Sequence, residues 1–434
     1  MAASPKAILL RTAQSRVDKT NVEDSQLVSS GGGMDIGIRA HCRRVATWAG
    51  ELGRALGLSD AERALVERSA FCHHVPELVL DDGARSRLLA EIGFEESGEQ
   101  SLFEEDVRRV LLALTERKEI DASTAKLVAV LEISNDFDQF FEAEPLVEAD
   151  NTDEYGHSSV QAMMSYLQVT SRSDVSRVID RLPIFPRAAK QVVKRVSDPE
   201  VTIDELESVA SLDPVLTGRI IQTANSAYFS PARPIASIHH AIAYIGSETT
   251  RRILLASTIR GNFASMRLHK LWNHSLDVAQ AAEELARKSV IGIEPAEAFL
   301  AGLVHDIGRL AFSIMPAKYL ERFYRLTDGG CPPVQVELCL SGRSHAEVGA
   351  ETLVQWKFAE SVVEAIRWHH APERTSLPLA SLLYLAEFVA DSDEDLPSFA
   401  RLSTASRISG IDADAIAQIE GKDRDVLDGL RFAA

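Results

Sequence analysis

The amino-acid sequence predicts an all-α protein built from two helical domains. Apolar residues recur at the 3.6-residue spacing of helices through most of the chain, and helix-capping signals precede several of these stretches. The alternating β-branched residues and Asn-Gly turns that indicate strands and hairpins are nearly absent. A length of 434 residues is too great for one ordinary core and favours two or three domains.

The first helical domain is expected at residues 34–142, after a flexible leader at 1–33 that lacks periodicity and ends in serines and glycines. Ser59 and Glu62 have the spacing of a capping box, which predicts the start of the second helix. Further helical patterns cover residues 103–114 and 122–141. The apolar stripe of the first helix consists of Val45, Trp48, Ala49, Leu52 and Leu56.

Residues 143–172 are expected to link the domains, because the first part of this range is acidic and poor in apolar side chains. The second domain is expected at 173–395. Its helix starts are marked by a capping box at Thr202 and by Asp213, a cap residue that precedes a proline. Residues 396–434 are expected to form a weakly helical tail.

The composition is that of a globular protein without a membrane segment. The chain is 45% hydrophobic and 25% charged, and its net charge of −18 argues against nucleic acid as a partner. The basic stretch at 251–270 is interpreted as a solvated helix face. Four cysteines without paired spacing indicate free thiols in a reducing compartment. The apolar run at 7–10 is too short for a signal peptide, so we expect a cytoplasmic protein.

Six of the 12 histidines fall between residues 269 and 370, most of them near carboxylates or other histidines. His305 and Asp306 are adjacent, and neighbours on a helix diverge by about 100°, so both can flank one cavity. A site of imidazoles and carboxylates without thiolate suits Fe, Mn, Zn or Ni better than a structural cysteine-type zinc. The alternatives are histidines satisfied within a core, or a vestigial site that holds no metal.

A series of short motifs runs in order through the second domain. They are Leu182-Pro183-Ile184-Phe185-Pro186, Asp213-Pro214-Val215-Leu216, Ala224-Asn225-Ser226-Ala227-Tyr228, Ile235-Ala236-Ser237-Ile238, His305-Asp306-Ile307-Gly308, His345-Ala346-Glu347-Val348-Gly349 and His369-His370. On these motifs, residues 174–390 resemble the HDOD family of HD-related output domains. The resemblance implies an HD-superfamily-like helical bundle preceded by a helical HDOD subdomain. It also implies a regulatory role in bacterial signalling.

The same resemblance implies a metal site. His274, His305 and Asp306 match ligand positions of the HD superfamily, and Glu387 stands where the pattern has its closing aspartate. The positions that ligate additional metal in multi-metal relatives are matched by His345, His369 and His370.

Two departures from the HD pattern argue against catalysis. Arg309 replaces the lysine that follows the HD-x-G motif, and no GYP signature follows His370. A cyclic-di-GMP phosphodiesterase of the HD-GYP kind is therefore not expected. If the site is active, Asp306 and Arg309 are the expected catalytic residues.

The N-terminal helices repeat part of this plan. His41 resembles His274, and the pair His73-His74 follows 32 residues later, where the second domain has its His-Asp pair. Asn135 stands at the position of the closing aspartate. Residues 34–142 therefore resemble a degenerate HD or HD-GYP domain that has lost two carboxylates and its metal. The alternative is an unrelated helical bundle with coincidental histidines.

Three functions are compatible with this sequence. The first is a non-catalytic signalling regulator that acts by contacting signalling proteins through its HDOD domain. The second is a metal-dependent phosphohydrolase that acts on a nucleotide or cyclic nucleotide. The third, nucleic-acid binding, is opposed by the net charge.

Overall fold

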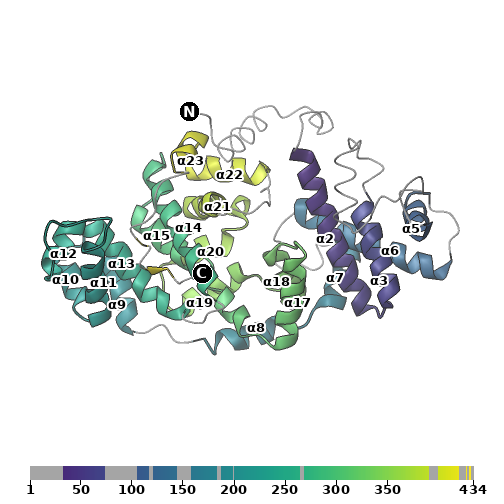
Figure 1. The fold of residues 1–434 in the computed structure, drawn as a ribbon, viewed down its shortest axis with the longest axis horizontal. Coiled ribbons are helices and arrows are strands. Elements are labelled where there is room, and N and C mark those ends of the chain that lie inside the picture. The colour runs from purple at the N-terminus through teal and green to yellow at the C-terminus, as the bar shows by residue number, and fades with distance from the viewer. Residues whose placement is uncertain are drawn as a thin grey trace. The chain divides into compact units, whose positions relative to one another are not determined.

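The computed structural model of the chain describes residues 33–73, 105–116, 121–143, 158–182, 187–198, 200–263, 268–390, 399–419, 427 and 430–431. All regular structure in these residues is helical (Figure 1), which confirms the all-α prediction. Residues 1–32 of the expected leader, the acidic segment at 144–157 and most of the tail beyond 419 lie outside the described residues. Within the described residues, every helix is too short or too polar to cross a bilayer.

The chain forms two compact units. Among the described residues, one unit comprises 33–175 and 315–344, and the other comprises 176–314 and 345–431. We call the former the N-terminal unit and the latter the histidine unit. Helix α8 (Arg172–Ile179) crosses the boundary.

The N-terminal unit is organised around its first long helix. Its helices are α2 (Gly33–Ala55), α3 (Asp60–Cys72), α5 (Glu105–Glu116), α6 (Ala122–Ala143), α7 (Ser158–Leu167), α17 (Ala317–Asp328) and α18 (Pro333–Ser341). The predicted stripe of α2 is largely buried, and Trp48 packs edge-on against Phe137 of α6 with 4.9 Å between ring centroids. The capping box at Ser59 is present and begins α3.

Helix α7 lies within the range expected to link the domains. Met163 and Leu167 on this helix are fully buried, and the helix packs against α6 and α2. The backbone N–H of Val169 also donates to the carbonyl of Leu340 at 2.8 Å. This stretch is therefore held in place by its own apolar face.

The histidine unit begins with a five-helix platform that precedes the bundle. It consists of α9 (Arg187–Val196), α10 (Ile203–Ala210), α11 (Pro214–Ala224), α12 (Ile238–Ile245) and α13 (Ser247–Arg260). Both predicted helix starts are present: Thr202 and Glu205 form a capping box, and Asp213 accepts a hydrogen bond from the backbone N–H of Val215 at 2.7 Å. Helix α13 packs on α15 and joins the platform to the bundle.

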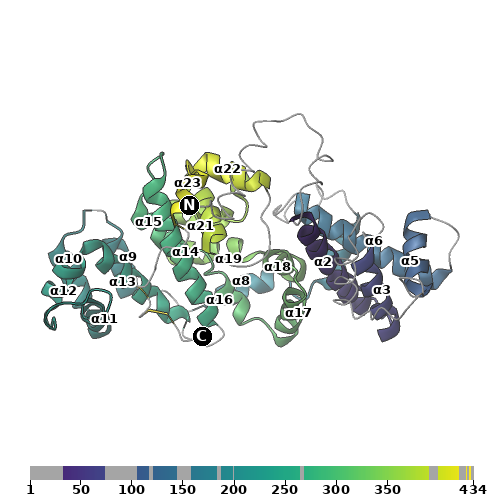
Figure 2. The ribbon, with the colours of Figure 1, turned by 45° about the horizontal axis from the view of Figure 1, so that its top comes forward.

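The bundle of the histidine unit carries the candidate site. Its helices are α14 (His269–Lys288), α15 (Pro295–Val304), α16 (Arg309–Ser313), α19 (His345–Gln355), α20 (Glu360–Trp368), α21 (Pro378–Ala390), α22 (Phe399–Ser409) and α23 (Ala413–Ile419). Figure 2 shows α14 and α15 side by side, and these two helices make the most extensive contact of the described residues. A Cβ on Gly302 would lie 2.5 Å from the Cα of Ala279, so glycine at this position permits the close approach. Helix α22 covers α21, and Leu402 and Ala405 are fully buried on it.

Candidate metal centre

Every side chain predicted as a metal ligand lies in one cluster of the histidine unit. The seven come from α14 (His274), the end of α15 (His305 and Asp306), the start of α19 (His345), the end of α20 (His369 and His370) and α21 (Glu387). Three overlapping triads bring ligand atoms within 4.8 Å of one another: His274, His305 and Asp306; His345, His369 and His370; and Asp306, His369 and Glu387. The cluster therefore unites segments more than 100 residues apart.

Asp306 lies at the centre of the cluster and is fully buried. Its carboxylate is 3.0 Å from Nε2 of His345, 3.5 Å from Nε2 of His305 and 4.0 Å from Nε2 of His274. The prediction that His305 and Asp306 are neighbours on a continuous helix is wrong. They lie in the turn that joins α15 to α16, and this turn directs both side chains into the cluster.

Glu387 supplies the second carboxylate of the cluster. Its two carboxylate oxygens lie 3.4 Å from Nε2 of His305 and 3.5 Å from Nδ1 of His370. His370 in turn approaches Nε2 of His345 at 2.9 Å through its own Nε2. Glutamate is one methylene longer than the aspartate of the HD pattern, and at this position it still reaches the histidines.

Two of the histidines are oriented by the backbone. Nδ1 of His305 donates to the carbonyl of Gly302 at 2.8 Å, and Nδ1 of His369 donates to the carbonyl of Ile366 at 2.6 Å. In the neutral ring, this hydrogen bond leaves a lone pair on Nε2. Both Nε2 atoms are buried and have no hydrogen-bond partner among the described residues. A metal-ligating histidine shows this arrangement, in which a backbone carbonyl fixes the ring that faces the metal.

The protonation states also suit metal ligation. Burial lowers the pKa of His369 to about 4 and lowers the pKa of His370, so both rings are neutral at pH 7. Burial would raise the pKa of Asp306, but the charge of Arg309 and the contacts with His305 and His345 hold it well below its ordinary value. Neutral imidazoles and ionised carboxylates are the states in which these groups bind a metal. The residues therefore fit a divalent ion.

Arg309 borders the cluster on one side. Its Nε lies 3.1 Å from Asp306, one helical turn away, and its side chain is 29% exposed. The guanidinium therefore combines a buried partner with access to solvent. A phosphate oxygen is the kind of group that it can bind from this position.

A close backbone contact aligns the His-Asp turn with α19. A Cβ on Gly308 would lie 2.0 Å from the carbonyl oxygen of His345 and 2.6 Å from the backbone N of Gly349. Only glycine fits here without displacing backbone atoms. The glycines of the two motifs therefore bring Asp306 and His345 together.

Comparison with known proteins agrees with the all-helical fold. Residues 182–372 match the model of the HDOD domain family. Residues 182–372 therefore form an HDOD domain. A structure from Geobacter sulfurreducens, described as an HDOD domain protein with unknown function, is 24% identical with a TM-score of 0.50. That match covers 62% of this chain and 98% of the other.

Two further matches to this chain extend the comparison. A structure from Shewanella amazonensis SB2B, named as a candidate phosphohydrolase, is 26% identical over 59% of this chain and 96% of the other, with a TM-score of 0.48. An uncharacterized protein of Treponema pallidum (strain Nichols) is 26% identical over 219 residues, or 48% of this chain. The match spans only 42% of that relative's length.

The N-terminal unit contains a second histidine cluster outside the HDOD span. The amide oxygen of Asn135 is 3.1 Å from Nε2 of His41 and 3.0 Å from Nε2 of His73. These three residues correspond, in the predicted repeat, to His274, His305 and the closing carboxylate. The structure brings them together, whereas His74 lies outside the described residues.

Sequence reasoning missed two residues of this second cluster. Asp138 is fully buried and accepts hydrogen bonds from His41 at 2.8 Å and from Arg44 at 2.9 Å. Arg44 therefore supplies a buried positive charge beside the histidines. The signal was the spacing: Arg44 follows His41 by three residues, and Asp138 follows Asn135 by three, which places each pair on one helix face.

Proposed function

We propose that this HDOD protein is a cytoplasmic signalling regulator that acts by contacting a partner protein through its platform helices. The observation that carries this proposal is the concentration of exposed apolar side chains on α10–α12 and their connections. Ile203, Leu212, Val215, Tyr228 and Tyr244 are 37–65% exposed. Exposed apolar residues scattered singly are ordinary, but a concentration of them in one subdomain is typical of a protein-binding surface. The buried free cysteines favour a reducing compartment.

Site-specific photocrosslinking tests this proposal. A photoreactive residue at position 228 should capture a discrete partner in cells, and that partner should then bind the purified protein. Leu212→Ser and Val215→Ser should each weaken binding about tenfold, because each removes an apolar anchor from the interface.

Val290→Ser is the matched control, because Val290 is 86% exposed and belongs to the same unit but lies outside the platform. Equal loss of binding in this control and in the platform variants would contradict a role for the platform. So would unchanged binding in Leu212→Ser and Val215→Ser.

The second candidate is a metal-dependent phosphohydrolase, and the buried histidine–carboxylate cluster favours it. Ligands drawn from the seven clustered side chains would hold the ion, which would supply an activated water and polarise a phosphoryl oxygen. Arg309 would bind a phosphate oxygen and orient the substrate. The carboxylate of Asp306 fixes the position of Arg309 through their ion pair.

Turnover assays decide between the two candidates. Purified protein supplied with Mn or Fe should be assayed against cyclic dinucleotides, (p)ppGpp and nucleoside phosphates. A hydrolase should lose turnover in Asp306→Ala and about 100-fold of its rate in Arg309→Gln. Arg367→Gln is the control, because Arg367 is 28% exposed and has the same i,i+3 carboxylate pairing but lies outside the cluster.

Absence of turnover with every substrate, together with binding of the partner by Asp306→Ala, would favour the regulator. Metal-dependent turnover that vanishes in Asp306→Ala and survives in Arg367→Gln would favour the hydrolase.

A further inference from the structure

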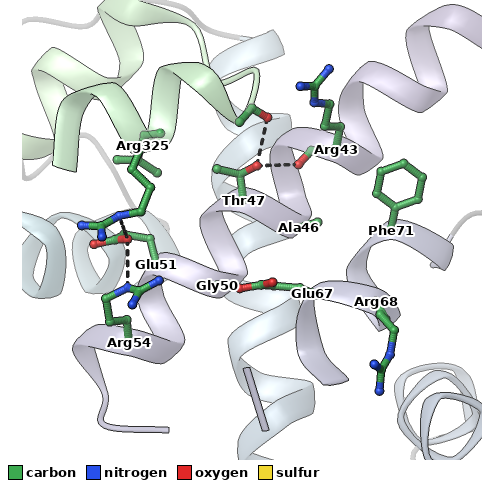
Figure 3. Close-up of a pocket in the computed structure, with 12 residues that line it drawn as sticks. Arg43, Ala46, Thr47, Gly50, Glu51, Arg54, Glu67, Arg68, Phe71 and Arg325 are labelled. Atoms are coloured by element: carbon green, nitrogen blue, oxygen red, sulfur yellow. Dashed lines mark hydrogen bonds and ion pairs between the residues drawn. The ribbon is translucent and has the colours of Figure 1, made fainter. Parts of the chain in front are cut away.

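The N-terminal unit contains a cavity that shares no residue with the histidine–carboxylate cluster or the platform. It has a volume of about 400 Å³ and is lined by α2, α3, α17 and the residues that follow α17 (Figure 3). This volume lies within the range of small-molecule sites. All of its lining residues belong to one compact unit.

The lining is basic in a protein that is strongly acidic overall. Four arginines line the cavity: Arg43, Arg54, Arg68 and Arg325. With two glutamates, at positions 51 and 67, the four positive charges leave a formal charge of +2. The whole chain carries −18, so this concentration of arginine runs against the composition. Planar guanidinium groups bind phosphate oxygens through paired hydrogen bonds.

Glu51 orders the arginines on one side of the cavity, which we call the inner wall. Its side chain is 2% exposed and pairs with Arg322 at 2.7 Å and with Arg325 at 3.0 Å. Arg54 approaches the same carboxylate at 3.5 Å. Figure 3 shows Arg54 and Arg325 on either side of Glu51. One carboxylate thus orders three guanidinium groups and offsets only one of their charges.

A second part of the lining, which we call the outer wall, contains Arg43, Thr47 and Phe71. It differs from the inner wall in how its arginine is paired. Arg43 is exposed, and its guanidinium donates to the backbone carbonyl of Asp328 at 3.3 Å. Among the residues that the structure describes, no carboxylate forms an ion pair with Arg43. Thr47 fixes the turn after α17 by donating to the carbonyl of Gly329 at 2.9 Å. Phe71 lies on the same side of the cavity as Arg43 (Figure 3) and presents a flat apolar surface. Aromatic faces of this kind stack on planar rings.

We propose that this cavity binds a phosphorylated ring compound of nucleotide size, with its phosphate on the arginines and its ring against Phe71. The cavity volume, the net positive lining and the adjacent aromatic side chain are the three features that such a ligand requires. The site is separate from the metal cluster and does not depend on the function proposed above. It joins the N-terminal helices to residues 315–344, which lie within the HDOD span and end directly before His345.

Isothermal titration calorimetry of the full chain tests the proposal. The probes are AMP and GMP, with adenosine and guanosine as the matching compounds without phosphate. EDTA is present throughout, so that a metal in the other unit contributes nothing. At least one nucleotide should bind, and its nucleoside should bind at least about tenfold more weakly. Arg43→Gln and Arg68→Gln should each weaken binding of the nucleotide about tenfold, and Phe71→Leu should weaken it by a smaller factor.

Arg109→Gln is the matched control, because Arg109 lies on α5 of the same unit, is 53% exposed and is not part of the cavity. Its affinity should equal that of the unaltered chain. Thermal unfolding of each variant shows that the N-terminal unit remains folded. The proposal is overturned if neither nucleotide binds, if the nucleosides bind equally well, or if Arg43→Gln and Arg68→Gln bind as tightly as Arg109→Gln.

Discussion

The burial of His369 keeps its ring neutral, the state that can ligate a metal, and it also makes the folded protein less stable in acid. Its ring is completely buried, its Nδ1 is engaged by the backbone, and its Nε2 faces the carboxylates of the cluster. Burial lowers its pKa to about 4, whereas the unfolded chain titrates near 6.5. The unfolded chain therefore binds more protons between these two values, and stability falls as the pH drops through this window.

In the presence of a metal chelator, we expect the free energy of unfolding to fall as the pH is lowered from 7 to 5. His369 should contribute about 2 kcal/mol of that loss. Urea unfolding at both pH values measures it. His369→Gln removes this titration and should reduce the difference between the two pH values by about the same amount. An equal difference in His369→Gln would show that His369 does not titrate as its burial implies.

At the scale of the helices, contacts between glycine backbones decide how closely the ligand-bearing segments approach. Gly308 precedes α16 and Gly349 lies within α19, and a Cβ on Gly308 would collide with backbone atoms. Because backbone atoms move less readily than the end of a side chain, any larger residue must separate the two helices. The distance between Asp306 and His345 depends on this contact.

Gly308→Ala is expected to destabilise the protein by about 1–3 kcal/mol, because it overpacks a backbone contact. It should also reduce the bound Mn or Fe, as measured by plasma mass spectrometry. Gly218→Ala is the control: Gly218 lies inside α11 with open space around it, and alanine there should stabilise the helix by about 0.5–1 kcal/mol. Similar stability of the two variants would refute the role of Gly308.

At the scale of the whole molecule, the two units depend on different interactions. The histidine unit places buried imidazoles and carboxylates at the centre of its bundle. The N-terminal unit contains a buried carboxylate, Glu51, that is matched to three arginines. Removing one partner of a buried ion network leaves the others uncompensated, which is costly.

Glu51→Gln should destabilise the N-terminal unit by about 3–5 kcal/mol, because Arg322 and Arg325 lose their buried counter-ion. Hydrogen exchange should accelerate in α2, α3 and α17, while the metal content of the histidine unit stays unchanged. Glu321→Gln is the control, because Glu321 is 74% exposed and pairs with the same Arg325. Its effect should stay within about 0.5 kcal/mol. Loss of metal in Glu51→Gln would show that metal binding in the histidine unit depends on the ion pairs of the N-terminal unit.

Local features of the fold were predictable from the sequence. The stripe at Val45, Trp48 and Leu52 is buried, and the caps at Ser59, Thr202 and Asp213 begin the expected helices. These features depend on neighbours within one or two helical turns, and such interactions can be read from residue spacing. The residue types of the histidine–carboxylate cluster were predictable through the HDOD motifs, which lie in short stretches of sequence.

The sequence by itself determined that the chain is helical, where its helices begin, and which side chains are suited to ligate a metal. Only the tertiary structure decided that seven of those side chains meet, that residues 315–344 join the N-terminal unit, and that arginines of α2, α3 and α17 line one cavity. The physical reason is the range of the interactions. Caps and stripes are stabilised within a single helix, whereas the cluster and the cavity depend on packing between helices that are distant in the chain.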